Sequence, residues 1–229
     1  MSNLYIVATP IGNLEDITLR ALRILKEVDL ILAEDTRVTR KLLDKYSIRT
    51  PIERFDAMME AKNPKRILSL LQGGRNLALV SDAGTPGISD PGGHIVSFLR
   101  EELPDTNIVP VPGASSLTTA LSVAGTHGAE FTFFGFLPHK KGRETLFKEM
   151  ASSKRAVVFF ESPHRILKAL ESLKKYCPEK KIVIAREMTK IYEEVLKGTA
   201  SELISKLEEE TEKQKGEFVV IVEKSLRSN

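Results

Sequence analysis

The chain has 229 residues, of which 41% are hydrophobic and 28% are charged, with a formal net charge of +3. These proportions are ordinary for a soluble globular protein of one large or two small domains. The longest apolar runs are too short to span a bilayer, and the single cysteine, Cys177, excludes an intrachain disulfide and a multi-thiolate metal site. Since the amino terminus shows no export signature, we expect a cytoplasmic protein that does not enter the membrane.

Apolar runs alternate with amphipathic stretches through the first half of the chain. The runs predict strands at residues 4–8, 29–33, 51–55, 77–81 and 108–111, and the stretches predict helices at residues 18–28, 36–46, 64–72, 92–102 and 115–124. Asn63, Asp90 and Ser162 each precede a proline, which predicts a capping residue followed by proline at the first helical position. This alternation is typical of a mainly parallel sheet with helices on both faces.

The pattern changes after a turn-rich stretch at residues 124–130, which we interpret as the boundary between domains 1–124 and 125–229. The second half contains the apolar runs "FTFFGFLP", "RAVVFFES", "KIVIARE", "EEVLKGT" and "GEFVVIVEK", with helices predicted at residues 143–151, 163–176 and 200–214. One of the last two strands is amphipathic and the other apolar, which favours a mixed sheet. The predicted fold class is therefore α/β, with two α/β domains in tandem.

Polar, turn-forming segments follow the predicted strands, and in open α/β sheets ligands bind beyond the carboxyl ends of the strands. The segments are "TPIGNLEDIT", "AEDTR", "SDAGTPGISDPGG", "VPGASS", "ESPHR" and "AREMTKIYEE". Their equivalent placement predicts one shared cleft. Neither G-x-G-x-x-G nor G-x-x-x-x-G-K-S/T occurs, which argues against a dinucleotide or P-loop site.

The glycine-rich segment at residues 82–93 contains two aspartates and no lysine or arginine. Backbone amides can bind a phosphate, but these aspartates favour a neutral or cationic ligand. Gly84 and Gly87 let a ligand approach the main chain, and Pro86 stiffens the turn. We expect Asp82 and residues 84–86 to contact a ligand, whereas we interpret Asp90 as the cap of the following helix.

Basic residues are concentrated in two places, with six Lys/Arg at residues 36–54 and eight at residues 139–168. Such clusters suit a polyanion, because binding neutralises phosphates and releases counterions. A solvated helix face is an equally good explanation of either cluster taken alone. The segment "FLPHKKGRE" combines aromatic, basic and glycine residues in a predicted mobile loop, which suits capture of an RNA backbone.

Taken together, "VATPIGNLEDIT", "AEDTR", "SDAGTPGISDPG", "VPGASS", "ESPHR" and "REMTKIYEEVLKGT" resemble the ribosomal RNA small subunit methyltransferase I family. That family belongs to the tetrapyrrole-methylase superfamily, and the resemblance extends over residues 4–222. It implies a homodimer of two-domain chains with S-adenosylmethionine bound in the cleft between the domains. The implied reaction is 2′-O-methylation of a cytidine ribose in the decoding region of small-subunit (16S) ribosomal RNA, with the small subunit or its RNA as partner.

The resemblance also implies site residues. The donor contacts that it implies are Pro10, Ile11, Thr85, Pro86, Ile88, Ser115, Ser116, Phe160, Ala185 and the segment near Glu217. Asp82 and Gly84, expected above from the glycine-rich segment itself, complete the donor-binding set. The expected RNA-facing set is Asp35, Thr36, Arg37, Lys140, Lys141, Arg143, His164 and Arg165. No histidine spacing suggests a metal ligand set, and we propose no metal.

A ribose hydroxyl is a poor nucleophile while protonated, so a base or a strong hydrogen-bond acceptor should help. Glu34, Asp35, Asp82, Glu161 and Glu187 are the candidates, and Glu161 and Glu187 come first because each ends an apolar strand. Arg186 and Lys190 are possible orienting cations. A structural ion pair with a nearby arginine remains an equal alternative for each carboxylate. Two other functions stay open: a tetrapyrrole C-methyltransferase and a non-catalytic RNA-binding protein.

Overall fold

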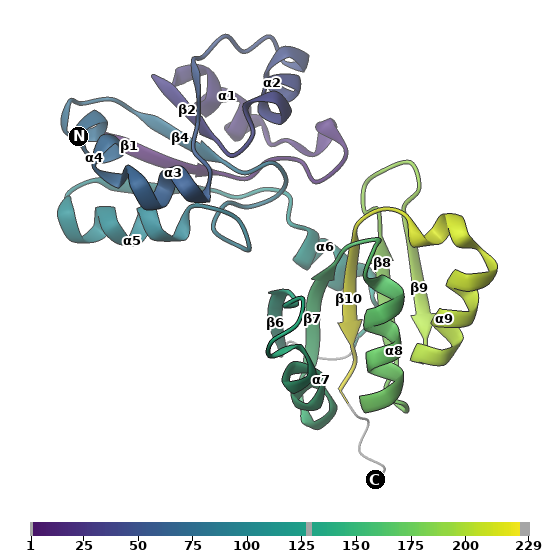
Figure 1. The fold of residues 1–229 in the computed structure, drawn as a ribbon. Helices are drawn as coiled ribbons and strands as arrows, with labels where there is room; N and C mark the ends of the chain where they lie inside the picture. The colour runs from purple at the N-terminus through teal and green to yellow at the C-terminus, as the bar shows by residue number, and fades with distance from the viewer. Residues whose placement is uncertain (1, 127–129, 225–229) are drawn as a thin grey trace. The chain divides into compact units, whose positions relative to one another are not determined.

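The computed structural model describes residues 2–126 and 130–224, and the chain forms two compact units, Met1–Ser115 and Ser116–Asn229 (Figure 1). The sequence places the boundary after Ala124, whereas the contacts group helix α6 (Ser116–Val123) with the second unit, because α6 packs against strand β10. Residues 127–129 of the expected linker lie outside the described residues. Each unit is described by itself below.

The first unit contains a five-stranded parallel sheet of order β3-β2-β4-β1-β5. Its strands are β1 (Asn3–Val7), β2 (Leu30–Ala33), β3 (Ile52–Arg54), β4 (Leu77–Val80) and β5 (Asn107–Val111). Its helices are α1 (Leu19–Glu27), α2 (Thr36–Lys45), α3 (Ala57–Lys62), α4 (Pro64–Gln72) and α5 (Gly93–Glu102), with a short 3₁₀ turn, η1 (Leu14–Asp16). The predicted parallel sheet is therefore confirmed.

Helices cover both faces of this sheet, so its central strands are apolar on both sides (Figure 1). On one face, Leu25 of α1 and Leu43 of α2 pack with Ala78 of β4. On the other, Ile67 of α4 packs with Leu79 of the same strand. Ala78 and Leu79 are neighbours in the chain, and the alternation of side chains along a strand sends them to opposite faces. The continuous apolar run that predicted this strand therefore marks a central position in the sheet.

The second unit contains a mixed sheet of order β6-β7-β10-β8-β9. Its strands are β6 (Phe131–Phe136), β7 (Ala156–Glu161), β8 (Ile182–Arg186), β9 (Glu194–Gly198) and β10 (Phe218–Val222). Only β6 and β7 pair in parallel among these; the other pairs are antiparallel, which confirms the predicted mixed sheet. Besides α6, the helices are α7 (Arg143–Ser152), α8 (Ile166–Tyr176) and α9 (Ala200–Glu209), followed by the 3₁₀ turn η2 (Thr211–Gln214).

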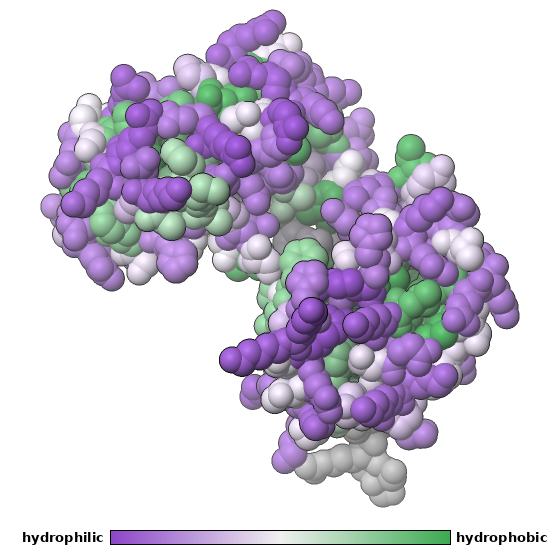
Figure 2. All heavy atoms as spheres, viewed as in Figure 1, coloured by the Kyte–Doolittle hydropathy of each residue, from purple (hydrophilic) through white to green (hydrophobic). Residues whose placement is uncertain are grey.

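Apolar side chains of α7, α8 and α9 pack on one face of the second sheet and form the core of this unit. Phe147 of α7, Leu170 of α8 and Leu203 of α9 lie in this cluster with Phe159 and Val220 of the sheet. Figure 2 shows hydrophilic side chains over most of the visible surface of each unit, as expected when apolar area is removed from water into such cores. No helix in the described part of the chain is long and apolar enough to cross a membrane.

The start of α5 differs from the sequence prediction. Asp90 does not cap this helix, which begins at Gly93 with Gly92 as its N-cap and a φ of +133° at Gly92. The cap comes instead from Glu60 of α3, a helix that the sequence analysis did not predict. Glu60 is buried, and its Oε1 accepts hydrogen bonds from the backbone N–H groups of Gly92 at 3.0 Å and Ile95 at 2.9 Å. A distant carboxylate thereby satisfies two N–H groups at the helix terminus.

Glu60→Ala is expected to lower the free energy of unfolding of the first unit by about 2–3 kcal/mol, because it leaves two buried donors without an acceptor. Urea unfolding followed by circular dichroism measures this change. Glu101→Ala, at an exposed position on α5 itself, is the matched control and should change stability by less than about 0.5 kcal/mol. Equal effects of the two substitutions would contradict the capping role.

Candidate active site

Three strand-end loops of the first unit meet at Gly84. Thr9, after β1, and Gly84, after β4, exchange two backbone hydrogen bonds of 2.9 and 3.0 Å. Gly84 has a φ of +86°, and a Cβ there would lie 3.5 Å from Ile11 Cγ2 and 3.8 Å from the carbonyl oxygen of Ala114, after β5. The Thr85 hydroxyl donates to the same carbonyl at 3.4 Å. The loops after β1, β4 and β5 thus gather at one edge, called here the first-unit edge.

Carboxylates crowd the first-unit edge. Asp82 Oδ1 accepts the backbone N–H of Asp35 at 2.9 Å, and the Asp82 N–H donates to Glu34 at 3.4 Å. Burial raises the pKa values of Glu34 and Asp82. Burial, reinforced by the charges of Glu34 and Asp82, raises the pKa of Asp90 to about 7. The crowding of carboxyl groups at this edge suits a cationic ligand better than a phosphate, because a cation favours their ionised form and a phosphate repels it.

The "AEDTR" segment has a clear local role. Asp35 is the N-cap of α2 and accepts the Arg37 N–H at 2.8 Å. Its carboxylate also pairs with the Arg37 guanidinium, and this hydrogen bond holds the pKa of Asp35 well below its usual range. Thr36 begins the helix, and Arg37 is exposed. The carboxylate of Asp35 therefore caps α2 and pairs with Arg37, while the Arg37 side chain remains accessible to solvent.

The carboxyl ends of β7 and β8 and the start of β10 form a second edge, called here the second-unit edge. Phe218 of β10 pairs with Glu161 of β7 and with Arg186 of β8, so these three residues form one row across the sheet. Residues directly opposite one another in antiparallel strands point to the same face. Phe218 belongs to the core under α7, α8 and α9, so Glu161 and Arg186 point to that helix-covered face. Phe160 and Ala185, one position earlier, point to the other face.

Glu187, Lys190 and Glu217 form a compact cluster at the second-unit edge. Glu187 Oε1 accepts from Lys190 Nζ at 2.9 Å and from the Glu217 backbone N–H at 2.9 Å, and Lys190 Nζ also contacts Glu217 Oε2 at 2.9 Å. Glu187 and Thr189 have positive φ values of 50° and 67°. Such left-handed backbone in non-glycine residues costs free energy and is concentrated at functional sites.

Electrostatics keep both members of the Glu187–Lys190 pair charged. Partial burial acts to raise the pKa of Glu187, but hydrogen bonds from Glu217 N–H and Lys190 outweigh it and leave the pKa below its ordinary value. Burial acts to lower the pKa of Lys190, yet its bonds to Glu187 and Glu217 raise it overall. Glu187 Oε2 makes no hydrogen bond within the described residues. The cluster therefore presents an ionised carboxylate with one oxygen fixed and the other available.

Arg186 supports the surrounding backbone. Its guanidinium is buried and donates to the carbonyl oxygens of Lys215 at 2.7 Å, Tyr192 at 3.0 Å and Glu212 at 3.1 Å. These three carbonyls belong to the β8–β9 connection and to the segment that leads into β10. Arg186 thus fixes the two segments that carry Glu187, Lys190 and Glu217, and each of its three guanidinium nitrogens already donates one hydrogen bond. This geometry favours a positioning role for Arg186.

Glu161 is fully buried between Arg143 and Arg165. Its environment favours the ion-pair alternative over contact with a ribose. Phe160 lies against Phe133 and Phe136, with ring centroids 4.9 and 5.4 Å apart in edge-to-face arrangements. These three rings form an aromatic cluster at the β6–β7 end of the sheet.

The remaining predicted site residues differ in exposure. Pro10, Ile11, Gly84, Pro86 and Ala185 are buried, Thr85, Ser115 and Ser116 are partly buried, and Ile88 is exposed. Lys140, Lys141 and His164 are exposed, and His164 lies in the turn before α8, which begins at Ile166 and not at the predicted residue 163. The buried members can contribute backbone groups and shape, whereas the exposed basic members can meet a large polyanion.

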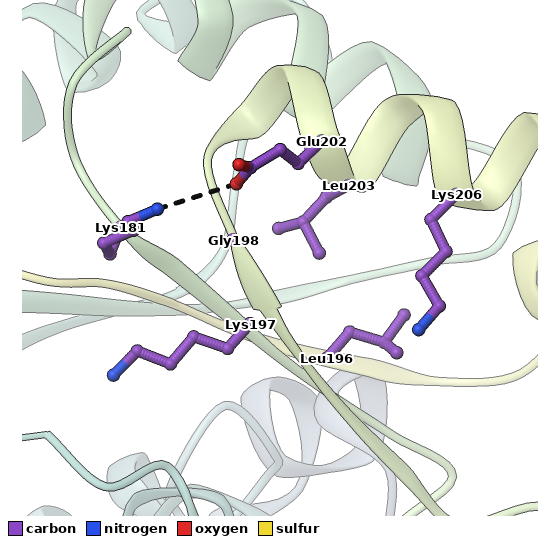
Figure 3. Close-up of a pocket in the computed structure, with 7 residues that line it drawn as sticks. All are labelled: Lys181, Leu196, Lys197, Gly198, Glu202, Leu203 and Lys206. Carbon is purple, nitrogen blue, oxygen red and sulfur yellow. Dashed lines mark ion pairs between the residues drawn. The ribbon is translucent and has the colours of Figure 1, made fainter.

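A separate pocket of about 340 Å³ lies between β9 and α9 (Figure 3). Lys181, Lys197 and Lys206 line it, together with Glu202 and apolar side chains. Lys181 pairs with Glu202 at 3.6 Å, and Lys197 pairs outside the lining with Glu223 at 2.6 Å. The pocket is at the amino end of β8, and therefore at the opposite end of the sheet from Glu187. Carboxylates offset most of its charge, so it is a poor candidate for the active site.

Three features of the site were missed from the sequence. Asp90 was interpreted as a cap, but it joins the carboxylates of the first-unit edge. Gly216, with a φ of +98°, closely approaches Glu187, and a Cβ there would lie 2.4 Å from Glu187 Cγ. The single glycine before the last apolar run was the only available signal for this approach. Nothing in the sequence pattern indicated that Glu60 caps α5.

Two α/β units with polar, glycine-rich loops at strand ends are the architecture of a known class of methylases. The family model of the tetrapyrrole (corrin/porphyrin) methylases matches residues 3–204. The fold agrees with that of the methyltransferase CobJ, with a TM-score of 0.72 and 20% identity over 98% of this chain and 95% of that chain. It also agrees with uroporphyrin-III-C-methyltransferase from Thermus thermophilus, with a TM-score of 0.66 and 20% identity over 96% of this chain and 94% of that chain.

Sequence relatives are much closer. A protein of Thermotoga maritima named ribosomal RNA small subunit methyltransferase I is 48% identical over 97% of this chain and 98% of its own length. Proteins of the same name from Escherichia coli O157:H7 and Bacillus subtilis are 45% and 41% identical over 96% and 98% of this chain, and 77% and 76% of their own lengths. The chain therefore belongs, within the tetrapyrrole methylases, to the ribosomal RNA small subunit methyltransferase I family.

Proposed function

We propose that the protein transfers a methyl group from S-adenosylmethionine to the ribose 2′-hydroxyl of a cytidine in the decoding region of small-subunit (16S) ribosomal RNA. The observation that carries the proposal is the ionised Glu187, which Lys190 and the Glu217 backbone hold by one oxygen while the other stays available. Family membership supports the substrate class, because the relatives are named as methyltransferases of small-subunit ribosomal RNA. A homodimer and a cytoplasmic location are part of the same proposal.

The first-unit edge suits the proposed donor. S-adenosylmethionine supplies an electrophilic methyl group on a sulfonium cation. The left-handed turn at Gly84 brings backbone from three loops together. The carboxyl groups of Glu34 and Asp82 lie at this edge together with Asp90, whose pKa of about 7 leaves it only partly ionised near neutral pH. We assign Pro10, Ile11, Thr85, Pro86, Ile88, Ser115 and Ser116 to donor binding with them. Phe160, Ala185 and Glu217 of the second unit complete the proposed donor set.

Glu187 is assigned to the ribose hydroxyl. Oε2 would accept the hydrogen bond of the hydroxyl and take its proton as the oxygen–methyl bond forms and the sulfur–methyl bond breaks, with the neutral thioether S-adenosylhomocysteine as the leaving group. Because the pKa of Glu187 is lowered, its main contribution is to orient the hydroxyl and stabilise the charge that develops on it, more than to act as a strong base. Lys190 holds the carboxylate in place, and positioning of this kind can supply much of the acceleration.

A methyl-transfer assay with labelled S-adenosylmethionine tests the proposal. The protein is offered small ribosomal subunits that lack the modification and, in parallel, a porphyrinogen. Label in RNA, with alkali resistance of the adjacent linkage, is expected for a 2′-O-methyl group. Label in the porphyrinogen alone would establish the tetrapyrrole C-methyltransferase alternative. If the protein transferred no label to either acceptor and bound RNA equally well with and without S-adenosylmethionine, the result would favour the non-catalytic RNA-binding alternative.

The raised pKa of Asp90 predicts a pH dependence of stability. A carboxyl with a pKa of about 7 in the folded state and an ordinary value near 3.8 when unfolded binds more protons in the folded state between those values. The free energy of unfolding therefore falls as pH rises from about 4 to 7, through ionisation of Asp90 beside Glu34 and Asp82. Thermal unfolding from pH 5 to 8 should show a steeper loss for the wild type than for Asp90→Asn. Parallel curves for the two proteins would contradict the prediction.

A further inference from the structure

We propose that Glu161 is a positioning residue that holds the basic loop, residues 138–142, in the conformation that captures the RNA backbone. The proposal rests on the proposed function for its substrate class and assigns Glu161 a role outside the chemical step. Three observations support it: the direction in which Glu161 points, the two arginines that it holds, and the charge that the basic loop presents.

Glu161 points away from the face that carries the proposed donor contacts. It is the last residue of β7, and its side chain has no exposed surface. The alternation of side chains along β7 places Phe160 on the opposite face of the sheet. Glu161 instead faces the layer of α7 and α8, where its carboxylate is enclosed. A side chain so placed cannot contact a ribose without unfolding its surroundings.

The carboxylate holds two arginines, one through each oxygen. Glu161 Oε1 lies 2.7 Å from Arg165 Nε, and Oε2 lies 3.1 Å from Arg143 Nη2. Arg143 begins α7, directly after the basic loop, and Arg165 immediately precedes α8. The Ser162 backbone N–H also donates to Oε1 at 2.9 Å. A single buried carboxylate therefore joins the end of β7 to the starts of two helices.

Both arginines extend this connection to the chain that enters the basic loop. Arg165 Nη1 donates to the carbonyl oxygen of Leu137 at 3.0 Å, and Arg143 Nη1 donates to that of Pro138 at 3.3 Å. The loop then closes on itself, because the Arg143 N–H donates to the Lys140 carbonyl at 3.2 Å. The entry and the exit of the basic loop are thus both fixed to Glu161 through guanidinium groups.

A buried cluster of one carboxylate and two guanidiniums is a poor way to gain stability. Desolvation of the charges offsets much of their attraction, and well-packed apolar residues are often as stabilising. Arg143 Nε is also buried without a hydrogen-bond partner, which adds to this cost. What such a cluster does provide is a defined geometry, since guanidinium forks bind carboxylate and carbonyl oxygens directionally. The arrangement points to placement of the loop.

The outer side of the basic loop has the charge that an RNA backbone requires. His139, Lys140 and Lys141 are exposed, and neither lysine forms an ion pair with any residue of the described part of the chain. Gly142 then turns the chain with a φ of +83°. Two unpaired lysines on a fixed loop can neutralise phosphates without first breaking an ion pair.

The test compares Glu161→Gln with Glu144→Gln, a matched substitution at an exposed position on α7. For Glu161→Gln we expect KM for small ribosomal subunits to rise by roughly tenfold, with kcat and the Kd for S-adenosylmethionine within about twofold. We also expect faster trypsin cleavage after Lys140 and Lys141 in the folded protein, because the loop is released. Glu144→Gln should change none of these quantities.

Two results would overturn the proposal: a loss of kcat with unchanged KM, or trypsin cleavage at the wild-type rate. If Glu161→Gln does not fold, Arg143→Lys keeps the charge but loses the second guanidinium contact, and the same trypsin result is expected of it. The trypsin measurement needs no RNA, so it tests the loop even if the wild type methylates a different acceptor. Failure of the proposed function is recognised separately, by the absence of label in RNA with the wild type.

Discussion

Glu187→Gln is expected to slow methyl transfer by about two orders of magnitude while the Kd for S-adenosylmethionine changes by less than about twofold. The substitution removes the negative charge that Lys190 and the Glu217 N–H fix through Oε1. It also allows an amide N–H₂ group to replace the available oxygen Oε2, and a donor there cannot accept the hydrogen bond of a ribose hydroxyl. Single-turnover transfer to unmodified small subunits measures the rate, and calorimetry measures the binding of the donor.

Glu223→Gln is the matched control for Glu187→Gln. Glu223 follows β10 and pairs with Lys197 at 2.6 Å, at the opposite end of the strand from Glu217. We expect this control to keep the wild-type rate. A Glu187→Gln enzyme with full activity would remove Glu187 from the reaction and return attention to Glu34 and Asp82. A loss of donor binding equal to the loss of rate would instead place Glu187 in the donor site.

Elements with strong local signals could be predicted from the sequence. Helix α4 has the predicted bounds because Pro64 begins it and Gly73 ends it. Helix α3 was missed since it has only six residues, and its main role, presentation of Glu60 to α5, is tertiary. Helix α8 begins after the predicted position because residues 163–165 form a turn, in which Arg165 forms an ion pair with Glu161. Local patterns therefore predicted the elements, and long-range contacts moved their ends.

The location of the candidate site at the ends of the strands could be predicted from the sequence, but the role of each residue could not. In the sequence, Glu161 and Glu187 each come at the end of an apolar run, and nothing in the pattern distinguishes their roles. The sheet separates them, because Glu161 is the last residue of its strand and points under the helices, whereas Glu187 lies beyond its strand in left-handed backbone. Asp90 shows the same limit, since a residue before proline resembles a cap whether or not a helix follows at once.

Gly216→Ala is expected to reproduce much of the activity loss of Glu187→Gln without changing a titratable group. A Cβ at Gly216 would lie 2.4 Å from Glu187 Cγ, 2.6 Å from Cδ and 2.7 Å from Oε1, so the carboxylate must leave its place. That displacement breaks the contacts with Lys190 and the Glu217 N–H. The left-handed φ of +98° adds a cost of about 1–2 kcal/mol in stability for any residue with a Cβ. Transfer rate and urea unfolding are measured on the same preparation.

Gly74→Ala separates the two effects of the Gly216→Ala substitution. Gly74 has a similar φ of +83°, but a Cβ there would meet no atom within 4 Å, so alanine at this position has only the conformational cost. Gly74→Ala should lose about 1–2 kcal/mol of stability and Gly216→Ala at least as much, and only Gly216→Ala should lose methyl transfer. If Gly216→Ala kept the wild-type rate, the fixed position of the Glu187 carboxylate would not matter for the reaction. Gly74 lies in the other unit, far along the chain from Glu187. If both variants lost methyl transfer, the loss would therefore come from reduced stability and not from displacement of the Glu187 carboxylate.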